Sequence, residues 1–239
     1  MNNGPVLNEL EIGSHLCCIY RDEEDRFRVL MSLVSLGIEE RHKIIVLIDE
    51  DKKRGVYNLD SSGVKKIVPL DKNKGSNRSE KEKLIDKFEE YWDKGQIRFY
   101  STQKVFKRTN KFSIKNVVSI LEKEIKKANK EGYSGLIVSS DLTWFLKNKR
   151  PKRELFDYEE QLNKKLQGKD ITLLCFYKEK WFPEDYLTDA IKTHPEVLTE
   201  KGICKNYYYL PPDLYKPGGR DKVIENYHKK MLEKINKSK

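Results

Sequence analysis

Nearly uniform hydrophobic runs constrain the fold of this 239-residue chain more than any other feature. Three of them read KIIVLIDE from Lys43, GLIVSSD from Gly135 and ITLLCFY from Ile171. A strand that is apolar at successive positions, rather than at every second one, is buried on both faces. This pattern is typical of a parallel sheet that is covered by helices.

Segments with helical periodicity alternate with these runs and with two further strand-like segments, HLCCIY and IRFYST. Three apolar stripes recur at helical spacing: Phe27, Leu30, Met31, Val34 and Ile38; Val117, Leu121, Ile125 and Ala128; and Leu155, Tyr158, Leu162 and Leu166. The alternation predicts an α/β fold, with a mostly parallel sheet flanked by helices on both faces. We also expect a weak helix near Lys52–Leu59 and one strand within HPEVLTEKGICKNYYYLPP.

The segment YKPGGR, with its proline and glycines, predicts the one domain boundary. We therefore expect an α/β domain over 1–215 and a basic helical tail over 216–239. The sequence has no run of 18 apolar residues, so we expect no membrane span. The N-terminus lacks the pattern of a signal peptide. The four cysteines show no CxxC spacing and lie in or beside apolar runs, which favours a cytoplasmic protein with reduced thiols.

The formal net charge of +10 permits nucleic-acid binding, but a Lys/Glu-rich solvated surface explains it as well. The junction after the first strand, YRDEEDR, argues against ordinary nucleotide binding. A phosphate-binding loop needs glycines that expose backbone N–H groups and a lysine that neutralises phosphate. The junction has neither, and its carboxylates would repel a triphosphate. Acids that cap a surface helix explain it instead.

Ligands of open parallel sheets bind beyond the carboxyl ends of the strands. Aromatic and acidic side chains follow several of these ends, namely Tyr20, Glu50, Asp141, Trp144 and Tyr177. If these ends meet, the rim suits a small organic ligand with an apolar body and a polar or cationic head. Trp144 and the tyrosines would contact the body, and Glu50 and Asp141 would orient the head.

Catalytic and metal sites have weaker signals. His15 and Cys17 share one face of their strand, and Cys175 could approach Cys204, but no spacing matches a zinc pattern. Cys17 or Cys175 could pair with His15 or His194 as a nucleophile and base, yet nothing in the sequence places them together. We expect buried thiols, no metal, no cofactor and no catalysis. For His15 and Cys17, the sequence leaves two roles open, namely ligand binding and packing in the core.

The residues that carry a family resemblance are spread over Leu10–Pro212. They form H-x-C-x-x-Y from His15, D-x-T-W from Asp141 and H-P…N-x-Y-Y-x-P-P from His194. This combination resembles the MEDS domain, a sensory domain of methanogen and methylotroph regulators. The matching positions are His15, Cys17, Tyr20, Glu50, Asp141, Trp144, Tyr158, Glu159, Cys175, His194, Pro195, Asn206 and Tyr208. The chain departs from the family at Asp141 and Leu142, where glutamate and methionine are frequent.

The resemblance implies a RecA-like, KaiC-like fold without the Walker A loop. It also implies a non-enzymatic sensor of a small organic compound, for example a methylated or hydrocarbon-derived one. Because no kinase or helix-turn-helix output domain is evident, signalling would need a regulatory protein partner or a homodimer, with the basic helix from Asp221 as the candidate dimerising element. Nucleic acid and membrane are not expected partners. The alternative is a degenerate RecA/KaiC-like protein that still binds nucleotide or nucleic acid.

Overall fold

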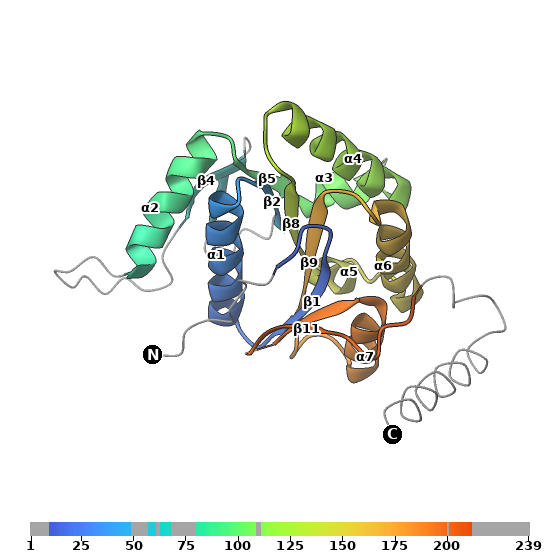
Figure 1. Ribbon diagram of the computed structural model, residues 1–239. Coiled ribbons are helices and arrows are strands. Elements are labelled where there is room, and N and C mark those ends of the chain that lie inside the picture. The colour runs from blue at the N-terminus through green and yellow to red at the C-terminus, as the bar shows by residue number, and fades with distance from the viewer. Residues whose placement is uncertain are drawn as a thin grey trace, which may run out of the picture.

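The computed structural model describes residues 10–48, 57–60, 63–67, 80–108, 111–199 and 201–211. Its centre is a seven-stranded sheet in the order β11-β10-β1-β9-β8-β2-β5 (Figure 1). The strands of this sheet are β1 (His15–Tyr20), β2 (Lys43–Ile48), β5 (Ile97–Ser101), β8 (Leu136–Asp141), β9 (Ile171–Lys178), β10 (Glu196–Thr199) and β11 (Gly202–Lys205). Each neighbouring pair is parallel except β10 and β11. The predicted α/β class and mostly parallel sheet are therefore confirmed.

Seven helices among the described residues accompany the sheet: α1 (Glu23–Glu39), α2 (Glu80–Asp93), α3 (Thr102–Phe106), α4 (Ile114–Lys130), α5 (Thr143–Lys147), α6 (Lys152–Leu166) and α7 (Glu184–Thr193). The sheet separates two hydrophobic cores. Side chains of α1 and α2 pack in one core, and side chains of α3 to α7 pack in the other. Helices therefore cover both faces, as the buried strands predicted.

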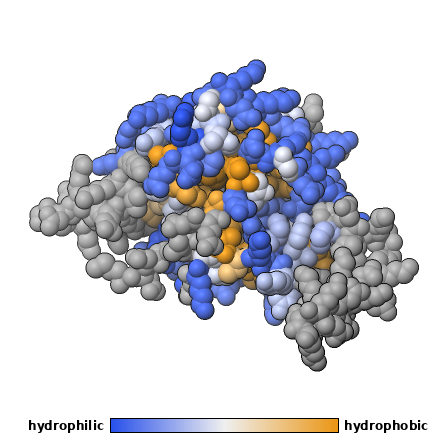
Figure 2. Space-filling model, viewed as in Figure 1, coloured by the Kyte–Doolittle hydropathy of each residue, from blue (hydrophilic) through white to orange (hydrophobic). Residues whose placement is uncertain are grey.

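The predicted helical stripes are the buried faces of their helices. All the stripe residues of α1, α4 and α6 are buried. Ser113 caps α4 by accepting a hydrogen bond from the backbone N of Asn116 at 3.2 Å. Seen in the view of Figure 1, the surface is largely hydrophilic, with hydrophobic residues visible in the middle of the face (Figure 2). None of the described helices is long and apolar enough to cross a membrane.

Some sequence predictions of local structure were wrong. The end of the expected weak helix is instead β3 (Tyr57–Asp60), which pairs with β4 (Gly63–Ile67) as an antiparallel hairpin. The strand-forming residues Tyr57, Val64 and Ile67 favour this pairing. Lys52–Val56 lies outside the described residues. The basic segment after β5 contains α3 and a second small hairpin, β6 (Lys107–Arg108) with β7 (Lys111–Phe112).

The region after His194 forms two strands rather than one. β10 joins the sheet beside β1, and β11 folds back on it in antiparallel register. Thr199 and Gly202 face one another across the turn, and the φ angle of Gly202 is +116°, which suits glycine. The predicted tail over 216–239 lies outside the described residues.

Candidate functional site

At the junction between β1 and α1, the side chain of Asp22 caps the start of the helix. Oδ1 of Asp22 accepts hydrogen bonds from the backbone N of Glu24 at 3.0 Å and of Asp25 at 2.9 Å. These are amides that a phosphate-binding loop would offer to its ligand. Because a carboxylate of the chain already takes them, the geometry agrees with a helix cap and not with a phosphate cradle.

The acids of the first helical turn have basic partners within the chain. Arg21 Nε donates to Asp25 at 2.9 Å, Arg26 Nε donates to Glu23 at 2.9 Å, and Lys178 Nζ donates to Glu23 at 2.7 Å. Burial alone would raise the pKa of Glu23, but these cations hold its pKa below the ordinary value. In the acidic run, Asp22 is thus a helix cap, and Glu23 and Asp25 form ion pairs.

The predicted ligand rim is divided between the two faces of the sheet. The hydroxyl of Tyr20 donates to Asp141 Oδ2 at 3.0 Å, and Asp141 Oδ1 accepts from the backbone N of Thr143 at 2.9 Å. Tyr20 belongs to the core beneath α1, whereas Trp144 and Tyr177 are buried in the opposite core. Trp144 packs against Phe106 with ring centroids 4.9 Å apart.

Glu50, the fifth residue of that rim, lies outside the described residues. Tyr20 and Asp141 are the pair that the structure brings together. No comparison or contact tests whether the rim binds a ligand, so this role stays a prediction.

A buried polar cluster lies on the other face, around the carboxylate of Glu159. Glu159 is 0% exposed, and its Oε2 lies 3.2 Å from His15 Nε2 and 3.6 Å from His194 Nε2. The Sγ of Cys175 lies 3.6 Å from the same oxygen and 3.4 Å from His15 Nε2. One ligand atom from each of these four residues lies within 4.8 Å of the others. We call these four residues the His–Glu–Cys cluster.

Hydrogen bonds fix the protons on both imidazoles. Asn163 donates through Nδ2 to the carbonyl of Thr193 at 2.7 Å, so its Oδ1 accepts from His15 Nδ1 at 2.9 Å. His194 Nδ1 donates to the carbonyl of Ala190 at 2.7 Å. With a proton on each Nδ1, a neutral ring presents its Nε2 lone pair to the cluster.

Burial controls the charges of the cluster. It lowers the pKa of His194 to about 4, with a further contribution from His15, so this ring is neutral near pH 7. Burial alone would raise the pKa of Glu159, but His194, His15 and Tyr177 hold it below the ordinary carboxyl value. Burial and the Glu159 carboxylate raise the pKa of the Cys175 thiol. A carboxylate, a neutral imidazole and a thiol therefore coexist there.

Two more of the predicted site residues, Tyr177 and Cys17, lie beside the cluster. The Tyr177 hydroxyl donates to Glu159 Oε1 at 2.7 Å, the oxygen that does not face the imidazoles. Cys17 is fully buried, lies opposite Cys175 in the register of β1 and β9, and belongs to the same core. Cys204, which might have joined Cys175, is exposed on β11.

Residue patterns alone did not predict this cluster. Its members come from β1, α6, β9 and the end of α7, and no local spacing relates such distant elements. The two-residue spacing of His15 and Cys17 correctly placed them on one strand face. The one sequence signal that contained Glu159, Cys175 and His194 together was the set of positions that match the family motif.

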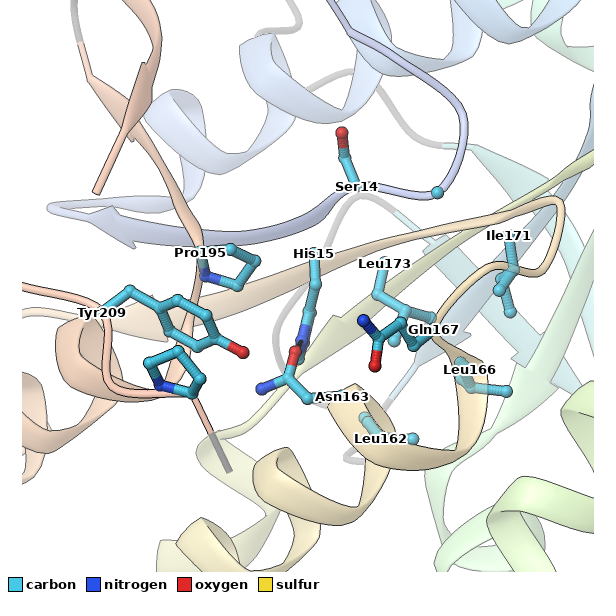
Figure 3. A pocket seen from close by; sticks show the side chains of 12 residues that line it. Ser14, His15, Leu162, Asn163, Leu166, Gln167, Ile171, Leu173, Pro195 and Tyr209 are labelled. Atoms are coloured by element: carbon cyan, nitrogen blue, oxygen red, sulfur yellow. Dashed lines mark hydrogen bonds between the residues drawn. The ribbon is translucent and has the colours of Figure 1, made fainter. Parts of the chain in front are cut away.

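A cavity of about 320 Å³ opens beside the cluster. Its wall is formed by the entry to β1, the end of α6 with the residue after it, the start of β9, the residue before β10 and the segment after β11. The lining residues include His15, Asn163, Leu166, Gln167, Pro195 and Tyr209. His15 and Asn163 lie at the middle of the cavity, with Tyr209 and Pro195 to one side and Gln167 to the other (Figure 3). Of the predicted ligand-binding residues, His15 lines this cavity.

The comparison with family models agrees with the sensory resemblance. The sequence model of the family described as MEthanogen/methylotroph, DcmR Sensory domain matches residues 14–195. No curated protein matches the chain significantly. Among solved structures, a KaiC-like protein from the hyperthermophilic archaeon Pyrococcus horikoshii OT3 is similar with a TM-score of 0.47 and 13% sequence identity. That similarity covers 82% of this chain and 78% of the other.

Proposed function

Because this chain belongs to the family of MEthanogen/methylotroph, DcmR Sensory domains, we propose that it senses a small organic molecule bound in the cavity beside His15. The observation that carries the proposal is the position of this cavity. Nine of the twelve residues that line it belong to the matched residues 14–195, and His15 and Asn163 are among them. Cavities of about 300–1,000 Å³ are the usual size for small-molecule sites.

The lining of the cavity indicates the ligand class. Leucine, isoleucine and proline side chains provide apolar contact, while Asn163, Gln167 and Tyr209 provide neutral polar groups. Among the described residues that line it there is no carboxylate, lysine or arginine. A neutral compound with a short apolar body and one hydrogen-bonding end fits this chemistry, and a methylated or hydrocarbon-derived compound belongs to that class.

The cavity also suggests how binding would be transmitted. Its far wall is formed by Pro195 and by the segment 206–211, which is tied to α7 by hydrogen bonds. Asn206 Nδ2 donates to the carbonyl of His194 at 2.7 Å, and the backbone N of Leu210 donates to that of Lys192 at 2.9 Å. A ligand that contacts Tyr209 would favour one position of this segment over others, which is the requirement for a switch.

The proposed sensor is not an enzyme, and it acts on a regulatory protein partner or on a second copy of the chain. In this proposal the rim around Tyr20 and Asp141 has a second, separate role in ligand contact. A thermal-shift series of rim variants, such as Tyr20→Phe, against the same ligand would separate the rim from the cavity.

A thermal-shift screen tests the cavity directly. The probes are small methylated amines, thiols and halocarbons, and a bound ligand raises the melting temperature. Gln167 is exposed at the cavity wall, so Gln167→Trp should fill the cavity without disturbing the core. Lys165→Trp, at a neighbouring exposed position outside the cavity, is the matched control.

We expect a stabilising probe to lose its effect with Gln167→Trp and to keep it with Lys165→Trp. Equal stabilisation of both variants would contradict the proposed cavity. ATP with Mg²⁺ and DNA at moderate salt are comparison probes. Stabilisation by either of these, with no response to the organic probes, would support the nucleotide- or nucleic-acid-binding alternative instead.

A further inference from the structure

We propose that the His–Glu–Cys cluster is a tetrahedral binding site for a transition-metal ion of the Zn²⁺ class, with His15 Nε2, His194 Nε2, Glu159 Oε2 and Cys175 Sγ as the four ligands. This site goes beyond the proposed sensory function and does not depend on it. Each donor comes from a different element of the fold, so a bound ion would join β1, α6, β9 and the end of α7.

Four of the six distances between the donor atoms are close to those of a tetrahedron around zinc, and all six lie within 4.8 Å. Zn–N and Zn–O bonds of about 2.0–2.1 Å and a Zn–S bond of about 2.3 Å give ligand-to-ligand distances of about 3.3–3.6 Å. The observed distances from Glu159 Oε2 are 3.2 Å to His15 Nε2, 3.6 Å to His194 Nε2 and 3.6 Å to Cys175 Sγ. The distance from His15 Nε2 to Cys175 Sγ is 3.4 Å.

The hydrogen bonds outside the cluster give a second, independent argument. Both imidazoles donate through Nδ1, to the side-chain oxygen of Asn163 and to the carbonyl of Ala190. Metal-binding histidines almost always donate their other ring nitrogen in this way, which turns the free lone pair toward the ion. Tyr177 likewise holds the carboxylate from its far oxygen at 2.7 Å.

The hydrogen bonds that are made and missing inside the cluster also favour a bound cation. The Nε2 of His194 is fully buried and makes no hydrogen bond, although it lies 3.6 Å from Oε2 of Glu159. It converges with a second imidazole nitrogen and a carboxylate oxygen, all of them acceptors when the rings are neutral. A buried acceptor without a donor is costly, whereas a cation satisfies several lone pairs at once.

The donor set determines the class of metal. Imidazole and thiolate ligands favour Zn²⁺ and related transition metals over Mg²⁺ and Ca²⁺, which prefer oxygen. Four protein ligands complete a tetrahedron, as in structural zinc sites. On binding, the Cys175 thiol releases its proton to solvent and coordinates as thiolate, while the two imidazoles and the carboxylate coordinate as they are.

Cobalt substitution tests the site in the full chain. After dialysis against a chelator, Co²⁺ is added, and its absorption reports a tetrahedral site and a thiolate ligand separately. We expect one Co²⁺ per chain with visible bands of tetrahedral strength and a near-ultraviolet sulfur-to-cobalt charge-transfer band. Cys175→Ala should lose the charge-transfer band. Cys18→Ala, a buried cysteine in the opposite core, should keep it.

Two results would overturn the site: folded wild-type protein that retains neither Co²⁺ nor Zn²⁺, or a charge-transfer band that persists in Cys175→Ala. The first would leave the cluster as a set of buried hydrogen-bonding side chains around Glu159. If Cys175→Ala does not fold, X-ray absorption of the zinc-loaded wild type still decides. It should show one sulfur and three lighter ligands, and a shell without sulfur contradicts the proposal. The Gln167→Trp screen involves no cluster residue, so the two proposals fail independently.

Discussion

The hydroxyl of Tyr177 donates a hydrogen bond of 2.7 Å to Oε1 of Glu159, on the side of the carboxylate opposite the two imidazoles. Both residues are completely buried. The tyrosine therefore satisfies the oxygen that the histidines do not reach, and it sets the orientation of the carboxylate plane toward His15 and His194.

Removing that hydroxyl should destabilise the fold. In Tyr177→Phe the buried Oε1 loses its donor, and we expect the free energy of unfolding to fall by about 1–3 kcal/mol. Urea denaturation of chelator-treated protein measures it, with Tyr208→Phe, whose residue is 73% exposed, as the control. Equal midpoints for Tyr177→Phe and wild type would show that Oε1 gains nothing from this bond.

The self-capped junction gives a second prediction. Asp22→Ala removes the acceptor for two backbone N–H groups at the start of α1, so we expect a loss of about 0.5–2 kcal/mol of stability. Glu24→Ala, at an exposed first-turn position, should change stability less. The measurement is thermal or urea unfolding of the two variants side by side. Comparable losses in both would mean that general charge at the helix start matters more than the cap.

Thiol reactivity should differ sharply among the four cysteines. Cys17, Cys18 and Cys175 are buried, while Cys204 is exposed. Burial and the charge of Asp25 raise the pKa of Cys18 to about 12, which disfavours the reactive thiolate. A colorimetric disulfide reagent should therefore label one thiol rapidly in native protein, and Cys204→Ser should abolish that phase. Rapid labelling of two or more thiols would contradict the buried positions.

Acid should weaken the start of α1. Arg26 and Lys178 hold the pKa of Glu23 below its ordinary value of 4.5 in the folded chain. Because the folded pKa is the lower one, this stabilisation is present above the unfolded pKa and is lost as pH falls through the folded pKa. Glu23→Gln should thus lower stability at pH 7 and flatten its decline below about pH 5. Stability measured against pH checks this, with exposed Glu24→Gln as control.

Local pattern was enough to predict the layers of this fold. Every stripe residue predicted for α1, α4 and α6 is buried, and the uniform runs are central parallel strands. Tertiary context decided the rest. The β10–β11 hairpin depends on the reversal of the chain between Thr199 and Gly202, and two short strands resemble one continuous strand in sequence.

The candidate site depended on which face of the sheet each side chain occupies. Strand-end position alone could not show that Tyr20 points to one core while Tyr177 points to the other. Parity along β1 and β9 does separate them, because Tyr20 lies an odd number of residues from His15, and Tyr177 an even number from Cys175. The position of Glu159 on α6 required the packed structure, since helix-to-sheet placement has no local sequence signal.

His15 lies on the cavity wall with one edge of its ring and faces Glu159 with the other. The imidazole thus lies between the cavity and the completely buried carboxylate of Glu159. We expect a small molecule to pass from the cavity to Glu159 only when this ring leaves its hydrogen bond with Asn163. We therefore expect small molecules to exchange slowly at the cluster and rapidly in the cavity. The residue at position 15 should control this difference.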